Sequence, residues 1–151
     1  MIRRAGMLVA TVLAVYAVLH LCWSTGLTWP APDATALSLV VLGFPVPFTP
    51  EVLLPLVVLL STAALLVAGR ARLGRAHRIG WLLQSGTVAV AVGLLLRASA
   101  GVIWGCGIGI RTDTAFYWLN LLGYTPLCLI LGVAAAAVAG HRVTGRPGKA
   151  S

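Results

Sequence analysis

The chain has 151 residues, of which 60% are hydrophobic and only 9% are charged, and its mean hydropathy is +0.99. A water-soluble domain of this length cannot bury so much apolar surface, so the composition excludes a soluble fold and predicts one membrane domain. The formal net charge is +8, but the basic residues lie at the edges of the apolar runs, which argues against a nucleic-acid partner.

The apolar runs predict α-helices, because they are continuous and lack the alternation of a membrane β-strand. A helix needs about 20 apolar residues to cross the hydrocarbon core. The sequence therefore predicts an all-α, integral membrane four-helix bundle over residues 1–151. Its spans are expected at about 5–23, 52–69, 79–100 and 117–139.

The first run, which follows Arg3 and Arg4, is either a cleavable signal peptide or a retained membrane anchor. Trp23 lies where a cleavage site requires small residues, and this favours the anchor.

The first loop, residues 24–51, contains a further apolar stretch, Ala36 to Phe44. About nine residues are too few to span a membrane, and Pro45 follows directly. We interpret the stretch as an interfacial or re-entrant piece of a partly ordered external loop. The alternative is a fifth span, which would place the C-terminus outside.

The basic residues predict the orientation of the spans. Nine of the eleven flank one set of span ends, whereas the opposite ends hold Arg111 and all three acidic residues, Asp33, Glu51 and Asp113. Cytoplasmic loops carry the excess of Lys and Arg, so both termini, including the tail 140–151, are expected in the cytoplasm. The nine are Arg3, Arg4, Arg70, Arg72, Arg75, Arg78, Arg142, Arg146 and Lys149.

Arg97 lies inside the third apolar run and is the most informative residue of the sequence. An arginine within the bilayer costs about 2.5 kcal/mol or more unless it reaches the interface or finds a partner. Its candidate partners are Glu51, Asp113 and His20. Either Arg97 marks the outer end of a shorter helix, or it lines a polar pocket that opens outward.

Helical spacing supports the pocket, because Tyr16 shares a face with His20 and Trp23, and Trp104 shares one with Arg97. Ordinary contact between hydrogen-bonded helices is the alternative. The candidate pocket residues are His20, Trp23, Glu51, Arg97, Asn120 and Tyr124. Gly86, Gly93 and Gly101 are expected to allow close helix contacts, and Pro126 is expected to kink the fourth span.

The three cysteines allow few kinds of chemistry. Cys22 and Cys106 could meet outside the membrane in a structural disulfide, whereas Cys128 lies mid-span. The sequence has no Cys-x-x-Cys pair to relay electrons, and it shows no metal or nucleotide motif. We expect no cofactor.

Three stretches resemble a bacterial family of short multi-pass membrane proteins, the domain of unknown function 3995: His20–Trp29, Leu94–Gly101 and Thr125–Gly132. The chain departs from the family pattern at Cys22, Leu27 and Thr125, which weakens a redox role for Cys22. The resemblance implies a multi-pass protein of the bacterial inner membrane and singles out His20, Trp23, Arg97 and Pro126. It implies no activity, substrate or catalytic residue.

The leading hypothesis is a non-enzymatic membrane protein that holds a small apolar or lipid-like ligand, or a partner helix, near Arg97 and His20. The alternatives are a small membrane oxidoreductase or lipid-modifying enzyme, and a transporter subunit. Membrane lipids are the expected partners, together with a second copy of the chain or another membrane protein.

Overall fold

The computed structural model describes residues 1–73 and 77–141, and four long helical stretches make up most of it. They are α1 (Ile2–Ser24), α3 (Pro50–Leu73), α4 (Gly80–Gly105) and Ala115–Gly140. Each is 23 to 26 residues long and apolar enough to cross a membrane. No strand occurs in this part of the chain, so the all-α prediction is confirmed, with four helices apolar enough to span a membrane.

The fourth stretch is not a uniform α-helix. It consists of α5 (Ala115–Leu119), a π-helical turn (Asn120–Tyr124) and α6 (Thr125–Gly140). The Thr125 amide donates to the Asn120 carbonyl, a hydrogen bond that spans five residues. Pro126 follows at once and has no amide hydrogen to donate. The kink expected at Pro126 stays a prediction, and the structure shows a widened turn just before this residue.

Local chemistry fixes the helix starts. Asp33 caps α2 (Ala34–Leu42) by accepting a hydrogen bond from the Ala36 amide at 2.8 Å, and Thr114 caps α5 by accepting from Tyr117 at 3.2 Å. Both are favoured N-cap residues. Pro50 is the first residue of α3, as expected for a residue that lacks an amide hydrogen.

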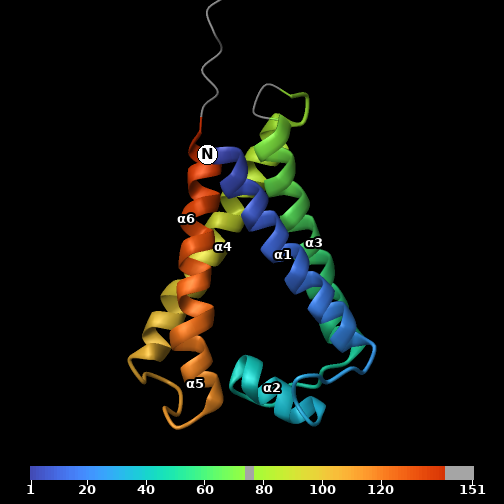
Figure 1. The fold of residues 1–151 in the computed structure, drawn as a ribbon, viewed down its shortest axis with the longest axis vertical. Helices are drawn as coiled ribbons and strands as arrows, with labels where there is room; N and C mark the ends of the chain where they lie inside the picture. The colour runs from blue at the N-terminus through green and yellow to red at the C-terminus, as the bar shows by residue number, and fades with distance from the viewer. Residues whose placement is uncertain (74–76, 142–151) are drawn as a thin grey trace, which may run out of the picture.

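The short helix α2 covers most of the apolar stretch predicted at Ala36 to Phe44, and it begins and ends two residues earlier. It is not among the helices long enough to span a membrane, so the five-span alternative gains no support. It lies across the end of the molecule opposite the N-terminus (Figure 1).

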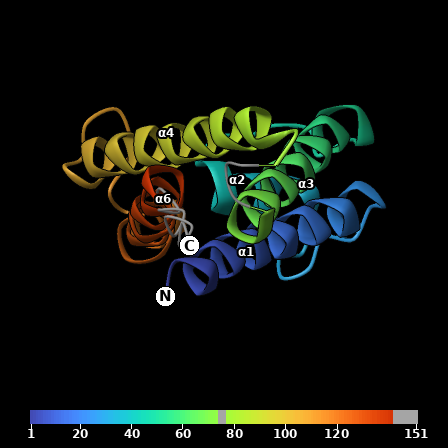
Figure 2. The ribbon, with the colours of Figure 1, turned by 90° about the horizontal axis from the view of Figure 1, so that it is seen from above.

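The long helices form two pairs, α1 with α3 and α4 with α6. The pairs converge where the N-terminus lies and diverge toward α2 (Figures 1 and 2). We call these regions the closed end and the open end. At the closed end a Cβ added to Gly6 would stand 2.6 Å from Ala71 Cβ and 3.3 Å from Val138 Cγ2, so α1, α3 and α6 touch almost backbone to backbone.

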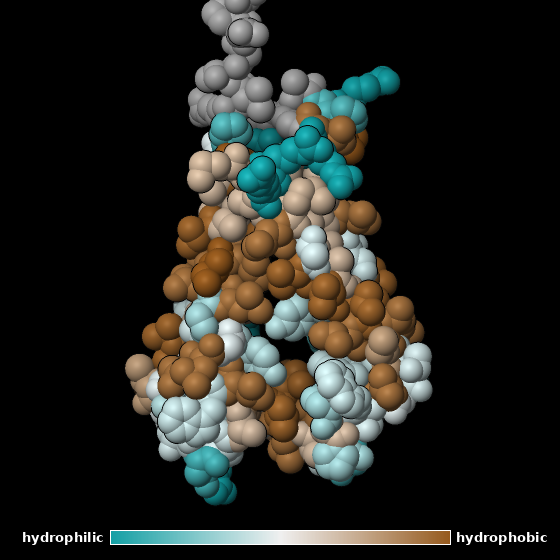
Figure 3. Space-filling view, in the orientation of Figure 1, coloured by the Kyte–Doolittle hydropathy of each residue, from teal (hydrophilic) through white to brown (hydrophobic). Residues whose placement is uncertain are grey.

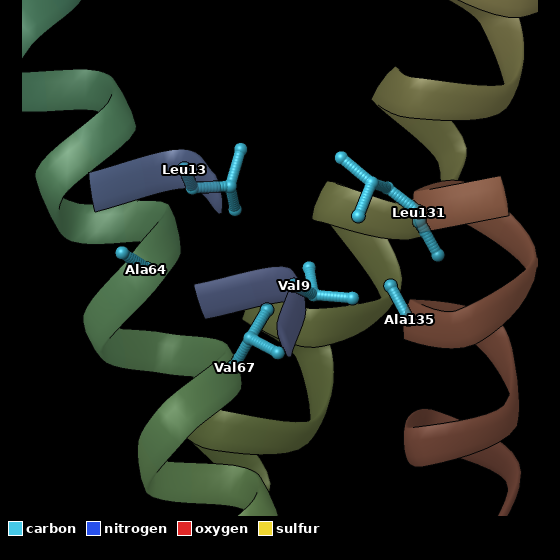
Figure 4. Close-up of a cluster of buried hydrophobic side chains, with 7 residues drawn as sticks. Val9, Leu13, Ala64, Val67, Leu131 and Ala135 are labelled. Atoms are coloured by element: carbon cyan, nitrogen blue, oxygen red, sulfur yellow. The ribbon is translucent and has the colours of Figure 1, made fainter. Parts of the chain in front are cut away.

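A cluster of buried aliphatic side chains joins the two pairs next to this contact. Figure 4 shows Val9 and Leu13 of α1 between Val67 of α3 and Leu131 of α6. Many members are small, which allows the helices to approach closely. The full cluster is Val9, Leu13, Ala64, Val67, Ala91, Leu131 and Ala135.

The sequence predicts Arg70 in a loop, where it would mark the orientation of the spans. In the structure Arg70 belongs to α3 and is buried at the closed end. Its side chain is only 3% exposed. Nε donates to Gln84 Oε1 at 2.8 Å and Nη2 donates to the His141 carbonyl at 2.7 Å, while Gln84 Nε2 donates to the Ala139 carbonyl at 3.0 Å. Arg70 thus ties α3 to α4 and caps the last carbonyls of α6. The other basic residues predicted on this side that the structure describes are Arg3, Arg4, Arg72 and Arg78; Arg75, Arg142, Arg146 and Lys149 lie outside the described residues.

Two of the three predicted contact glycines lie between helices. A Cβ at Gly86 would stand 2.6 Å from Leu66 Cδ1, and one at Gly101 would overlap Thr125 Oγ1. The prediction for Gly93 was wrong, because nothing lies within 4 Å of a Cβ built there. Gly93 is on an exposed face of α4, so its spacing from Gly86 and Arg97 did not place it at a contact.

The outer surface of the helices is strongly apolar. Leu65, Trp81 and Leu122 are each more than 70% exposed. Figure 3 shows hydrophobic residues over the middle of one face and hydrophilic residues at the closed end. Lipid tails solvate such a band, whereas water does not.

Candidate functional site

A cavity of about 230 Å³ lies between the two helix pairs, on the open side of the buried cluster. Figure 3 shows the face hollowed between the pairs. Most of its wall is aliphatic, and the exceptions are Tyr16, Arg97, Tyr124 and Cys128. The lining residues are Leu13, Tyr16, Val41, Leu42, Leu60, Leu94, Arg97, Tyr124, Leu127, Cys128 and Leu131.

Helix α2 forms the cover of this cavity and contributes Val41 and Leu42 to its wall. On one side it is anchored by Leu37, which is 1% exposed and belongs to a buried cluster with Trp23 and Leu53. On the other side it reaches α5, because a Cβ at Gly43 would stand 2.6 Å from Phe116 Cδ1.

Gly43 is also the residue that ends α2. Its φ of +83° lies in the left-handed region that favours glycine. The close approach to Phe116 and the sharp end of the cover therefore both depend on the absence of a side chain at this position.

The Arg97 guanidinium lies at the cavity wall with neutral partners. Nη1 and Nη2 each donate to Asn120 Oδ1 at 3.2 Å, and Cζ stands 4.9 Å from the centroid of the Trp104 ring. The indole face attracts the cation without neutralising its charge. The side chain is half-buried.

Asn120 is the residue that orients Arg97. It is fully buried, Nδ2 donates to the Gly101 carbonyl at 2.9 Å, and Oδ1 also accepts from Thr125 Oγ1 at 3.3 Å. It is the first residue of the π-helical turn, a feature common at functional sites. Sequence analysis predicted that Arg97, Asn120 and Tyr124 share a pocket, and the structure brings these three together.

None of the predicted partners of Arg97 contacts it. Asp113 binds Arg111 instead, with Nη2 and Oδ2 2.7 Å apart, and Glu51 is exposed at the start of α3. The Arg111–Asp113 pair lies in the exposed loop before α5, where the hydrogen bond from Arg111 holds the pKa of Asp113 below its ordinary value. Asn120 and Trp104 take the place of the predicted carboxylates beside Arg97.

His20 and Trp23 belong to a different part of the molecule. His20 Nδ1 donates to the Tyr16 carbonyl at 2.7 Å, and its ring meets Trp23 edge-on with centroids 5.0 Å apart. Trp23 Nε1 donates to the Trp29 carbonyl at 3.0 Å, and its ring lies 5.9 Å from that of Phe48. These contacts fasten the first loop to α1, and neither residue lines the cavity.

Several lining residues were missing from the predicted site. Tyr16, which lines the cavity, and Trp104, whose ring contacts Arg97, lie on the faces that sequence spacing singled out, so that signal could have found them. Val41 and Leu42 gave no such signal, because their role depends on the loop folding back over the helices.

The three cysteines are free thiols. Cys22 ends α1 and Cys106 follows α4, and Figures 1 and 2 show that these helices end on opposite sides of the molecule. The disulfide that we considered between them is therefore not formed. Over residues 1–73 and 77–141, no group of three or more His, Cys, Asp or Glu side chains is placed to hold a metal ion.

A second, outer pocket of about 620 Å³ lies beside the cover. It shares Leu42 with the cavity wall, and it is also lined by Trp104, Arg111, Thr114 and Phe116. Leu42 therefore stands between the apolar cavity and a more polar pocket at the open end.

A family model described as "protein of unknown function (DUF3995)" matches residues 13–135. The match includes every residue that lines the cavity and all of α2. Comparison with curated proteins and with solved structures finds no match.

Proposed function

Because the chain belongs to the DUF3995 family, as its motifs predicted, and that family carries no assigned activity, we propose its function from the cavity. We propose that the protein holds one chain of a lipid-like ligand in the apolar cavity beneath α2, within the membrane. The observation that carries this proposal is an aliphatic cavity that lies between the two helix pairs, has Val41 and Leu42 of α2 in its wall and is bordered by the Arg97 side chain.

The cavity is a candidate ligand site, because ligand pockets are concave and lined mostly by apolar side chains with a few polar groups. Its volume of about 230 Å³ is below the roughly 300–1,000 Å³ of pockets for drug-sized ligands. It therefore suits one alkyl chain or a small amphiphile and is too small for a whole two-chain phospholipid.

The divergence of the helix pairs supports entry of the ligand from the bilayer. The pairs separate toward α2 (Figure 1), and the surrounding helix surfaces are apolar. The alkyl chain of a ligand can therefore pass sideways from the surrounding lipid into the cavity without crossing water. To reach a water-soluble binding protein, the same chain would have to cross water.

The charge distribution supports a cytoplasmic closed end. Arg3, Arg4, Arg72 and Arg78 flank the closed ends of α1, α3 and α4, and the three acids lie in or next to the loops of the open end. With positive residues inside, the cavity and α2 would lie in the outer leaflet of a bacterial inner membrane.

The test is retention of lipid by a protein whose cavity is filled. Leu60→Trp places an indole at the cavity wall, whereas Leu65→Trp places the same group on the outer face of α3, where Leu65 is 73% exposed. Native mass spectrometry from a gentle detergent should detect a bound small molecule on the wild type and Leu65→Trp, and none on Leu60→Trp. Thermal unfolding of each variant verifies that it is folded. If Leu60→Trp does not fold, Leu42→Trp serves in its place, because it fills the cavity from the side of α2. The proposal fails if the wild type carries nothing, or if all variants carry the same molecule.

A further inference from the structure

We propose that Arg97 binds the anionic head group of the ligand, so that the cavity selects a single-chain amphiphile with a carboxylate or phosphate. This inference rests on the proposed function, because the cavity supplies the site for the chain. The argument starts from the charge of Arg97 and its depth in the helix.

The charge of Arg97 is permanent, since a guanidinium is not deprotonated in proteins. Arg97 is the eighteenth of the 26 residues of α4, and the last residue, Gly105, lies eight positions further along. At about 1.5 Å per residue the Arg97 backbone is roughly 12 Å from that end. A cation at this depth favours an anion beside it, because the surrounding dielectric is low.

The protein supplies no such anion. The chain has three acidic residues, and each is placed elsewhere: Asp33 caps α2, Asp113 pairs with Arg111, and Glu51 is exposed at the start of α3. The groups that do contact Arg97, the Asn120 amide and the Trp104 ring, are neutral. The charge is therefore oriented by the protein but left uncompensated.

The hydrogen-bonding capacity of Arg97 is also only partly used. A guanidinium has five N–H donors in a planar fork. Asn120 Oδ1 accepts from Nη1 and Nη2, and among the residues that the structure describes, none accepts from Nε. The edge formed by Nε and one Nη remains for two parallel hydrogen bonds, which is the geometry that carboxylate and phosphate oxygens match.

Two further donors line the same cavity. Tyr16 and Tyr124 are half-buried at its wall, and within the described part of the chain their hydroxyl groups have no hydrogen-bond partner. The combination of one cation, two hydroxyls and an aliphatic wall fits an anionic head group attached to a single chain. A neutral chain of equal length would leave these groups without acceptors.

The experiment compares ligands that differ only in the head group. The full-length protein, freed of lipid in detergent, is titrated with oleate, oleoyl lysophosphatidate and neutral oleyl alcohol, and binding is followed by native mass spectrometry. We expect the wild type to prefer an anionic ligand by about ten- to a hundredfold, the range of a charge-assisted hydrogen-bond pair. The anionic ligand that binds more tightly shows whether the head group is a carboxylate or a phosphate.

Two variants remove the charge in different ways. Arg97→Gln should abolish the preference, so that the two anionic ligands bind no more tightly than oleyl alcohol does. Asn120→Asp should also abolish the preference, because it keeps the arginine but places a carboxylate beside the guanidinium. This variant provides the test if Arg97→Gln does not fold. Arg111→Gln, which removes the exposed arginine of the outer pocket, is the matched control and should keep the preference.

The outcomes separate this inference from the proposed function. Equal affinity of the wild type for all three ligands, or a preference that survives both Arg97→Gln and Asn120→Asp, overturns the role of Arg97 and leaves the lipid-binding function standing. Absence of binding by any ligand, together with no effect of Leu60→Trp on retained lipid, overturns both.

Discussion

Replacement of Arg70 by methionine should destabilise the whole bundle, because this side chain connects three helices at the closed end. Methionine keeps an unbranched side chain and removes every donor. The change eliminates the hydrogen bonds from Nε to Gln84 Oε1 at 2.8 Å and from Nη2 to the His141 carbonyl at 2.7 Å. It also releases Gln84, whose amide donates to the Ala139 carbonyl.

The magnitude follows from these contacts. A hydrogen bond from a charged group contributes about 1.5–3 kcal/mol, so two such bonds contribute about 3–6 kcal/mol. Water can reach carbonyls at the end of a helix and compensate in part, so we expect a loss near the lower limit, about 3 kcal/mol. For a chain of this size that corresponds to an apparent Tm lowered by about 6–12 °C.

The assay is thermal unfolding in detergent, followed by the reactivity of the three free cysteines with a thiol-reactive dye. Arg72→Met is the matched control, because Arg72 lies on the same helix, carries the same charge and is exposed. Its Tm should stay within about 2 °C of the wild type, as expected for a surface substitution. Equal shifts for the two variants would show that Arg70 acts only through its charge, and would refute its role as a link between helices.

Three further predictions follow from the packing, the thiols and the cover. Gly86→Val should destabilise the bundle by about 1–3 kcal/mol through the contact with Leu66, whereas Gly93→Ala should have no effect or stabilise slightly, because nothing lies near it; equal losses in thermal unfolding would contradict the assigned helix faces. Cys106 is exposed and should react with a membrane-impermeant maleimide on intact cells without prior reduction, whereas half-buried Cys128 should not; a need for reductant would mean that Cys106 is in a disulfide. Gly43→Val should loosen the cover, because the residue combines a left-handed φ with the Phe116 contact. Retained lipid should then exchange faster with added detergent, and an unchanged exchange rate would argue that α2 does not control access.

The spans could be predicted because continuous apolar runs leave few alternatives to membrane helices. The ends of the helices could not be predicted, because a helix can continue beyond the charged residues that interrupt an apolar run. Helix α3 continues through Arg70 and Arg72 to Leu73, and α4 continues past Arg97 to Gly105. Arginine is a good helix former. The position of a charged residue therefore says little about where the backbone leaves the helix.

The candidate site was predictable where its residues lie on long helices. Arg97, Asn120 and Tyr124 occupy inward faces that periodicity identifies, and the structure joins them. His20, Trp23 and Glu51 were misplaced because the first loop folds back onto α1 and encloses the two aromatic residues, while Glu51 stays exposed beside it. The cover formed by α2 depends on the same long-range contact, which no local pattern encodes.

An experimental structure of the protein crystallised from a lipid mesophase would test the central claim most directly. The account predicts an elongated density beneath α2, between Leu60 and Leu127, that ends beside the Arg97 guanidinium. Helix pairs that close on each other, with side chains filling this space and Arg97 turned to the surface, would contradict it.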